Sequence, residues 1–240
     1  MKHSDVLVII PCYNEEANIQ RVVQRLMDTC PDVDYLVVND CSTDHSEAIL
    51  KENHFNYVSM PVNVGIGGGV QTGYRYARDN GYQIAVQMDG DGQHSPEYLE
   101  TVIAPVRSGE LDQCIGSRFL EKEGFQSSFL RRFGIRFLSA LIYLLSGVKV
   151  HDVTSGFRAT GPELTAFFAD NYAADYPEPE AIMTATLAGF KIGEAPVIMN
   201  ERLGGTSSIR SFKSAYYMIK VSLALIIDRM SCHRKGGPRT

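Results

Sequence analysis

Two aspartates one residue apart, Asp89 and Asp91, are the residues of this chain best suited to chemistry. They belong to the run Asp89-Gly90-Asp91-Gly92-Gln93-His94, which directly follows an apolar, strand-like segment. Carboxylate oxygens suit Mg²⁺ or Mn²⁺, ions that keep several waters and bind substrate phosphates. A polar turn with aspartate as a local backbone acceptor is the simpler alternative, but it gives no reason for two acids after a buried strand. The pair predicts a metal site.

Two familiar binding patterns are matched only in part. A calcium loop needs its glycine at the sixth position, whereas this run has Gly92 at the fourth and Pro96 inside the loop. The run Gly65–Gly69 lacks the glycine spacing of a dinucleotide fingerprint and does not follow the first strand. We reject both interpretations and expect the glycines of residues 65–69 to serve a turn and helix packing.

Acidic and amide side chains also follow two other expected strands. The segments are Pro11–Glu16 and Asn39–Asp44. Taken alone, each could serve only to cap a helix, through Asn14 and Asp44. Together with the aspartate pair on the same edge, they are interpreted as walls of a nucleotide pocket.

Arginines form a third group of candidates, because a guanidinium binds phosphate through paired hydrogen bonds and stays charged. Arg118 follows a strand, Arg131 and Arg132 open an apolar helix, and Arg202 lies in the loop 201–208. Any one of them could be a surface arginine. For Arg136 we favour that interpretation, with the charged end in water and the stem on apolar surface.

Alternating elements must position these residues. We expect strands over residues 6–10 (ended by Pro11), 35–38, 57–60, 83–88 and 112–116. Helices are expected over 14–26, after 44 with Asp44 and Glu47 spaced as a capping box, over 65–78, and from Ser95-Pro96 onward. This alternation predicts a mostly parallel α/β sheet with helices on both faces, and in such sheets ligands bind beyond the carboxyl ends of the strands.

The second half of the chain is richer in apolar helices. Residues 129–148 and 214–230 each form a long apolar stretch with a few basic residues. We expect these helices to lie in a membrane interface or against a membrane partner protein. Burial in the core or in a homo-oligomer interface is the alternative.

Charge is distributed unevenly over the 240 residues, whose formal net charge is −5. Residues 201–240 contain eight Lys or Arg against two acids, so they carry about +6 and residues 1–200 about −11. This asymmetry suits a protein that approaches anionic phosphates or an anionic membrane along one side, although a solvated basic tail would look the same. We expect no nucleic-acid partner.

The location is expected to be cytoplasmic, with the inner face of the cell membrane as an alternative. The first five residues offer no signal peptide, and no apolar run reaches the roughly 18 residues of a membrane span. Five cysteines without a CxxC pair predict reduced thiols.

Five ordered motifs resemble those of inverting family 2 glycosyltransferases with the GT-A fold, the group that includes dolichyl-phosphate mannose synthase and bacterial polyprenyl-phosphate glycosyltransferases. They are Pro11-x-Tyr13-Asn14-Glu15-Glu16, Asn39-Asp40-x-Ser42-Thr43-Asp44, Asn63-x-Gly65 with Gly73, Asp89-x-Asp91, and Thr154-Ser155-Gly156-Phe157-Arg158. The resemblance covers roughly residues 5–210. It implies a Rossmann-like GT-A catalytic domain over 1–210, followed by a C-terminal amphipathic helix and basic tail over 211–240.

The resemblance also implies roles for individual residues. Pro11, Tyr13, Glu15 and Asp40 would hold the base and ribose, and Asp89, Asp91 and Gln93 the Mg²⁺ or Mn²⁺ and the diphosphate. Arg118 and Arg131 would face the acceptor phosphate, and Arg202 would close over the donor diphosphate. A uridine diphosphate sugar carrying glucose or N-acetylglucosamine is the expected donor, with a deoxysugar as an alternative.

The expected reaction is in-line displacement at the anomeric carbon with inversion, onto a polyprenyl phosphate. That acceptor is already anionic and needs no general base. A saccharide hydroxyl, the alternative acceptor, would need one, and Asp152, Glu178 and Glu180 are the candidates. The prolines at 177 and 179 favour an extended segment for the latter two.

Two other classes of protein remain as rivals. A nucleotidyltransferase would need a glycine-rich basic loop after the first strand, where this chain has Pro11-Cys12-Tyr13-Asn14. A non-catalytic nucleotide-sugar-binding subunit would have no reason to keep the aspartate pair and the arginines.

Overall fold

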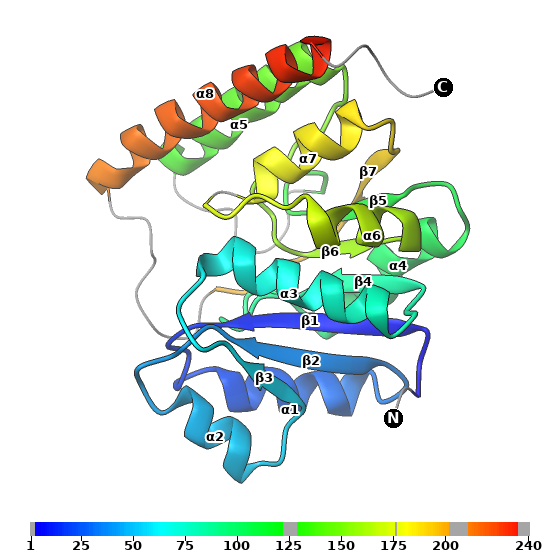
Figure 1. Ribbon diagram of the computed structural model, residues 1–240, viewed down its shortest axis with the longest axis vertical. Coiled ribbons are helices and arrows are strands. Elements are labelled where there is room, and N and C mark those ends of the chain that lie inside the picture. The colour runs from blue at the N-terminus through cyan, green and yellow to red at the C-terminus, as the bar shows by residue number, and fades with distance from the viewer. Residues whose placement is uncertain (1–2, 122–128, 176, 202–210, 235–240) are drawn as a thin grey trace.

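The computed structural model describes residues 3–121, 129–175, 177–201 and 211–234 (Figure 1). Within these ranges, seven strands form one sheet in the order β3-β2-β1-β4-β6-β5-β7. The strands are β1 (Val6–Cys12), β2 (Asp34–Asn39), β3 (Tyr57–Ser59), β4 (Ile84–Gln87), β5 (Gln113–Ser117), β6 (Arg158–Thr160) and β7 (Ile192–Pro196). Only β6 runs antiparallel to its neighbours, β4 and β5, so the predicted mostly parallel sheet is confirmed.

Helices cover both faces of the sheet (Figure 1). On one face lie α1 (Ile19–Thr29), α2 (Ser46–Glu52) and α4 (Leu99–Arg107), the last preceded by the 3-10 turn η1 (Pro96–Tyr98). On the other face lie α3 (Gly65–Asp79), α5 (Phe129–Ser146), α6 (Pro162–Asp170), α7 (Pro177–Leu187) and α8 (Ser211–Arg234). Two separate apolar cores result, as the continuous apolar run of β1 requires, since both faces of that strand are buried.

Pro11 lies inside β1, so the prediction that it ends the strand was wrong. The amide of Asp40 donates to the Cys12 carbonyl on the β2 side, and the amide of Met88 donates to Ile9 on the β4 side. Pro11 therefore faces the β4 side, where pairing with β1 ends at Ile9. The missing proline N–H costs no ladder hydrogen bond there.

The first helix begins later than predicted, and the capping box of the second forms only in part. Asn14 has a φ of 55°, in the left-handed region, and α1 starts only at Ile19. The predicted capping box before α2 is half formed: Asp44 accepts from the Ser46 amide, but the Glu47 carboxylate accepts from the Ser59 hydroxyl instead. The polar residues that follow the strands thus form hydrogen bonds outside the helices and do not extend them.

The prolines at 177 and 179 lie in the first turn of α7, so the predicted extended segment was wrong. Backbone N–H groups in the first turn of a helix have no intrahelical acceptor. Proline loses nothing at those positions, and its fixed φ suits the helix. This helix brings Glu178 and Glu180 to different surroundings.

The glycines of residues 65–69 belong to the start of α3. A Cβ at Gly67 would lie 2.0 Å from the carbonyl oxygen of Ala173, and one at Gly73 would lie 2.2 Å from Ile9. These glycines therefore let α3 approach β1 and the segment before α7, which confirms their predicted role in helix packing.

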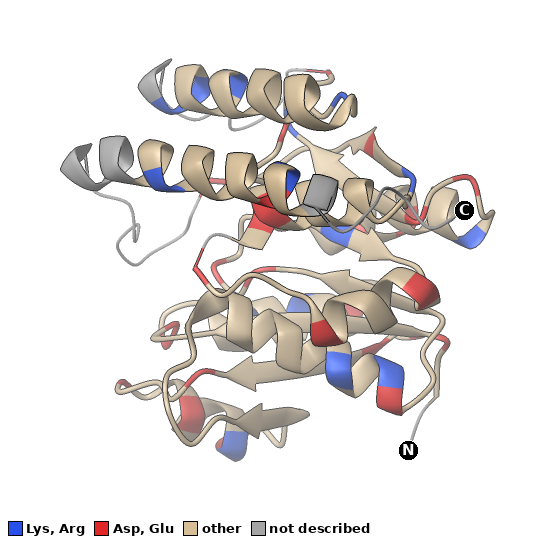
Figure 2. Cartoon of the chain, turned by 45° about the horizontal axis from the view of Figure 1, so that its top comes forward, with Lys and Arg blue, Asp and Glu red and all other residues tan. Residues whose placement is uncertain are grey.

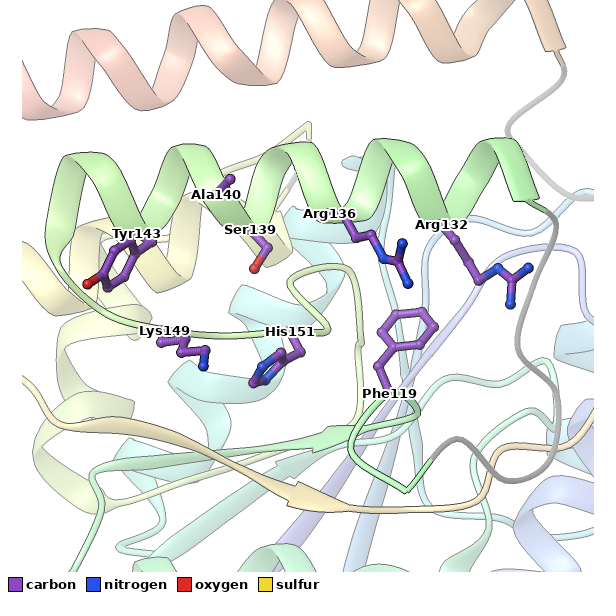
Figure 3. A pocket seen from close by; sticks show the side chains of 8 residues that line it. All are labelled: Phe119, Arg132, Arg136, Ser139, Ala140, Tyr143, Lys149 and His151. Atoms are coloured by element: carbon purple, nitrogen blue, oxygen red, sulfur yellow. The ribbon is translucent and has the colours of Figure 1, made fainter.

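The helices α5 and α8 run side by side in the same direction above α7 (Figures 1 and 3). Val221 and Leu225 of α8 share a core with Ile135, Leu138 and Ile142 of α5. None of the helices in the described part of the chain combines the length and apolar character that crossing a lipid bilayer requires.

Candidate active site

The polar segments that follow β1, β2 and β4 meet at one edge of the sheet. These three strands are neighbours in the order β2-β1-β4, and all point the same way. The chain proceeds from β1 outward to β2 and β3 and then returns to β4 on the other side. A parallel sheet opens a crevice for ligands at such a point.

Asp89 is held at the end of β4 by contacts on three sides. Its amide donates to His94 Nδ1 at 3.0 Å, and Gln87 Nε2 donates to its Oδ1 at 3.2 Å. His94 is itself buried and stacked on Phe157, with ring centroids 5.2 Å apart. On the third side lies Gly156, where a Cβ would be 2.7 Å from Asp89 Oδ2. The carboxylate thus has a fixed position and is only partly exposed.

Asp91 lies two residues farther along the same turn. Its Oδ1 accepts from the Gln93 amide at 3.0 Å, and the Gln93 carbonyl accepts from the Asn200 amide at 2.9 Å. Asn200 Nδ2 also donates to Ser95 Oγ at 2.9 Å. The turn is therefore attached to the segment after β7, a connection that no local sequence signal predicted.

The two aspartates fit a hard divalent ion. Among the described residues no group of three or more His, Cys, Asp and Glu is placed to hold a metal, so a protein-only cage is not formed there. Mg²⁺ and similar ions commonly bind through one or two carboxylates and complete their shell with waters and substrate phosphates. Asp89 and Asp91 supply the two carboxylates of such a site.

The residues predicted to contact a nucleotide form the β1 and β2 side of the edge. Tyr13 is 49% exposed, and the carboxylate of Glu15 accepts from Asn18 Nδ2 at 2.8 Å. Asp40 is 4% exposed, and its Oδ1 accepts from the Val64 amide at 2.7 Å. Asp40 therefore orders the loop that leads into α3.

The β1 and β2 turns are also tied to each other. Asn14 Oδ1 accepts from the Thr43 amide at 2.8 Å, and the Asn14 amide donates to Ser42 Oγ at 3.0 Å. These bonds hold the two walls of the edge at a fixed separation.

Arg118 and Asp152 form a buried ion pair beside the edge. Arg118 Nε and Nη2 donate to the two carboxylate oxygens of Asp152 at 2.7 and 2.8 Å, and Asp152 is fully buried. Glu194 of β7 in turn accepts from the Asp152 amide at 2.8 Å and from the His151 amide at 2.8 Å. Both carboxylate oxygens of Asp152 thus bind Arg118. Glu194 was not predicted from the sequence, because it is a single acid inside a short strand.

Arg131, in the first turn of α5, lies within the electrostatic reach of the same groups. Desolvation lowers the pKa of its guanidinium, followed by the repulsion of Arg118, while Asp152 and Asp91 act in the opposite direction. Arg131 is therefore within electrostatic range of Arg118, Asp152 and the predicted metal ligand Asp91.

The other two candidate bases have separate surroundings. Burial raises the pKa of Glu178, whose charged neighbours are Arg158, Asp89 and Arg131. Glu180 is influenced instead by Asp228 and Lys220 of α8. Of these two acids, only Glu178 has residues of the candidate site among its charged neighbours.

Arg158, at the start of β6, is fully buried and binds backbone rather than acids. Its guanidinium donates to the carbonyls of Ser155, Glu178 and Val153 at 2.7, 2.9 and 3.2 Å. It joins the loop that contains Gly156 to the first turn of α7. Arg202, predicted to cover the donor, lies outside the described residues.

Comparison with known proteins agrees with this geometry. The family model described as "Glycosyl transferase family 2" matches residues 7–164. The polyprenol monophosphomannose synthase of Mycolicibacterium smegmatis is 31% identical over 90% of this chain and 85% of its own length. The UDP-N-acetylglucosamine–dolichyl-phosphate N-acetylglucosaminyltransferase of Methanococcus voltae is 30% identical over 93% of this chain and 98% of its own length.

A solved structure shares the fold. Glucosyl-3-phosphoglycerate synthase of Mycobacterium tuberculosis, in complex with Mn²⁺, UDP and glucosyl-3-phosphoglycerate, superposes with a TM-score of 0.69 at 20% identity. The match covers 93% of this chain and 79% of that one. The predicted GT-A fold is confirmed.

Proposed function

The chain belongs to glycosyl transferase family 2, and on that premise we propose that it transfers a sugar, with inversion, from a uridine diphosphate sugar to a polyprenyl phosphate. The observation that carries the proposal is that Asp89 and Asp91 follow β4, and Arg118 follows β5, in the same sheet. The acidic pair suits a metal-bound leaving diphosphate, and Arg131, which is within electrostatic range of Asp91, suits an anionic acceptor. The similar proteins named above act, by their names, on polyprenol or dolichyl phosphate.

The donor half of the site would use the sheet edge. Asp89 and Asp91, with Gln93, would hold Mg²⁺ or Mn²⁺, which when bound neutralises charge on the departing nucleoside diphosphate. Tyr13 offers an exposed ring to the base. Pro11, Glu15 and Asp40 would line the base and ribose, and Arg202 would contact the diphosphate.

The acceptor half would use the arginines at the start of α5 and after β5. Arg131 supplies positive charge for the acceptor phosphate, and the Arg118–Asp152 pair beside it fixes the wall of the site. Because Asp152 neutralises much of the charge of Arg118, Arg131 carries the main electrostatic attraction. The phosphate oxygen then attacks the anomeric carbon on the face opposite the leaving diphosphate.

The buried acids support a phosphate acceptor over a hydroxyl. Both oxygens of Asp152 already accept from Arg118, and Glu180 lies toward α8. Glu178 alone would serve a hydroxyl acceptor in the saccharide-transfer alternative, since its raised pKa and nearness to Asp89 suit a proton acceptor.

A donor screen tests the reaction. The protein is incubated with undecaprenyl phosphate and UDP-glucose, UDP-N-acetylglucosamine or a GDP-linked mannose, and products are identified by mass spectrometry. A lipid-linked sugar is expected with one donor and only with a divalent ion present. Transfer to free saccharide but to no lipid phosphate would contradict the acceptor assignment.

The Asp91→Asn variant tests the metal site. We expect an unchanged melting temperature and a loss of turnover of at least about a hundredfold, because a charge opposite the departing diphosphate is lost. Asp32→Asn, an exposed aspartate between α1 and β2, is the matched control. Full activity of Asp91→Asn would remove the metal-site assignment.

The Arg131→Ala variant tests the acceptor site. It is expected to raise the KM for polyprenyl phosphate by about tenfold or more, since charge-assisted contacts to phosphate are lost, while UDP binding measured by calorimetry stays the same. Arg107→Ala, on the exposed face of α4, should change neither quantity. Weakened UDP binding in Arg131→Ala would instead assign this arginine to the donor.

A further inference from the structure

A basic pocket lies outside the proposed catalytic residues. It has a volume of about 560 Å³ and opens between α5 and the segment 147–151 (Figure 3). Arg132, Arg136 and Tyr143 line it from α5, and Lys149 and His151 line it from the segment. None of the residues assigned above to donor, metal or acceptor lines this pocket.

The residues that line the pocket are basic, polar or apolar. None of its lining residues is acidic, and within the described residues no hydrogen bond or ion pair engages the side chains of Arg132, Arg136 and Lys149. His151 Nδ1 is held by the Glu194 carboxylate at 2.7 Å. Figure 3 shows Arg132 and Arg136 reaching from α5 toward the opposite wall. Such a group of cations favours a phosphate.

The walls of the pocket are fixed to each other. The hydroxyl of Ser139 on α5 donates to the Val150 carbonyl, and Glu194 holds the amide of His151. Cationic side chains on two connected walls are already close before an anion binds, which reduces the cost of ordering them.

An exposed apolar face of α5 lies beside the pocket. Phe133 and Leu144 are 67% and 80% exposed, and Phe137 lies between them on the same face of the helix. One residue is about 100° of helix rotation, so this face is adjacent to the face of Arg132, Arg136 and Tyr143. The helix α8, which packs beside α5, has exposed apolar residues of its own: Ile219, Leu223, Ile226, Ile227 and Met230. Figure 2 shows basic residues on both helices.

We propose that this pocket binds the phosphate headgroup of an anionic phospholipid and so seats α5 and α8 on the membrane surface. A phospholipid carries its negative charge next to acyl chains, which matches a cationic pocket next to exposed Phe133 and Leu144. Helices with this combination of basic and apolar faces lie in the membrane interface. A free anion would leave the apolar face unused. The site is distinct from that of the acceptor and does not depend on sugar transfer.

Vesicle sedimentation tests the proposal with the full chain. Binding to vesicles of phosphatidylcholine is compared with binding to vesicles that also contain phosphatidylglycerol, with neither polyprenyl phosphate nor donor present. We expect binding only with phosphatidylglycerol. The double variant Arg136→Gln/Lys149→Gln should weaken it by about tenfold or more, because each basic residue near an anionic surface adds to the attraction.

The matched control is Lys51→Gln/Arg107→Gln, which removes the same charge from the exposed surfaces of α2 and α4. It should bind vesicles like the wild type, and all variants should keep the wild-type circular dichroism and melting temperature. Equal loss in both double variants would mean that only net charge matters and would overturn the pocket. Calorimetric binding of inorganic phosphate as tight as that of the vesicles would assign the pocket to a free anion instead.

Self-association is checked in the same preparations. If the exposed faces of α5 and α8 pack against those of a second copy of the chain, light scattering would give twice the mass of the chain and vesicle binding would be absent. That result would overturn the membrane assignment. Sugar transfer measured separately in detergent would stay intact in Arg136→Gln/Lys149→Gln, so a failure here is distinguishable from a failure of the proposed reaction.

Discussion

Gly156 is the residue whose small size the predicted metal site most directly requires. It faces the Asp89 carboxylate so closely that a Cβ would lie 2.7 and 2.8 Å from its two oxygens and 2.9 Å from Gln87 Nε2. Since Gln87 binds the carboxylate and His94 accepts from the Asp89 amide, a side chain at position 156 would push the carboxylate out of this fixed position.

The Gly156→Ala variant is therefore expected to fold but to lose activity. A methyl group would displace Asp89 by a few tenths of an ångström or more, and errors of that size in a catalytic constellation cost about tenfold to a hundredfold in rate. The readout is kcat together with the Mn²⁺ concentration for half activity, which should rise.

Gly69→Ala is the matched control for this substitution. Its Cβ would meet only Val38 Cγ1, at 4.0 Å, and it lies inside α3, where alanine is the better helix former. Activity should be retained and the melting temperature should hold or rise. Wild-type metal dependence in Gly156→Ala would remove Gly156 from the site.

Residues that act through local sequence could be predicted, and residues that act through distant partners could not. Asp89 and Asp91 were found because two acids directly follow an apolar strand. The buried pairing of Asp152 with Arg118, and the support from Glu194, join positions 34 and 42 residues apart. No pattern in the sequence marks such pairs, so Asp152 was interpreted as a candidate base.

At the scale of elements, the contact between α7 and α8 carries two half-buried acids. Burial and the nearby Asp228 raise the pKa of Glu180 to about 7, and burial also raises the pKa of Asp228. Asp228 Oδ2 is buried without a hydrogen-bond partner among the described residues. Nearby, Lys220 pairs with Asp175 and partly offsets the repulsion.

This contact should make stability depend on pH. The pKa of Glu180 is about 7 in the folded chain against 4.5 for the ordinary carboxyl. Because the folded pKa is the higher one, its contribution to stability is fully present below pH 4.5 and is lost as the pH rises through about 7. Part of the shift is screened, because Glu180 is half-buried, which leaves about 1 kcal/mol.

The Glu180→Gln variant tests the titration. It should show a flatter dependence of melting temperature on pH between about pH 5 and pH 8, and it should be the more stable protein at the upper end, by about 2–4 °C. Glu163→Gln, an exposed acid on α6, should keep the wild-type slope. An unchanged slope in Glu180→Gln would show that other groups carry the dependence.

The sequence predicted β1–β5, the three-residue β3 among them, but neither β6 nor β7. The five expected strands correspond to β1–β5, with their ends shifted by one or two residues. The three-residue β6 was missed, because its Arg158 is buried only through carbonyls supplied by other segments. The prolines of α7 favoured an extended chain locally, but packing of the helix on the core decided its conformation.

At the scale of the whole molecule, the candidate site joins both halves of the fold. Tyr13 and Asp40 follow β1 and β2, Asp89 follows β4, and Gly156 and Asn200 come from the segments before β6 and after β7. The two apolar cores lie on opposite faces of the sheet, and the site lies at the edge where both end. A ligand that contacts these segments together stabilises the folded chain as a whole.

Binding of UDP together with Mn²⁺ should therefore raise the melting temperature, and the full increase should require both ligands. At one hundred times the dissociation constant a ligand adds about 2.7 kcal/mol. For a chain of this size that corresponds to about 5–10 °C in differential scanning fluorimetry. UDP with Mn²⁺ should give the full shift, and UDP with a chelator or Mn²⁺ alone a small part of it.

The Asp91→Asn protein separates the metal from the nucleotide in this measurement. It should keep the small shift with UDP alone, because Tyr13, Glu15 and Asp40 are intact, and lose the increment from Mn²⁺. AMP with Mn²⁺ serves as the control ligand and should shift neither protein. If UDP shifts the melting temperature of the wild type equally with Mn²⁺ and with the chelator, the nucleotide binds without the aspartate pair. The ion would then have no place at this edge of the sheet.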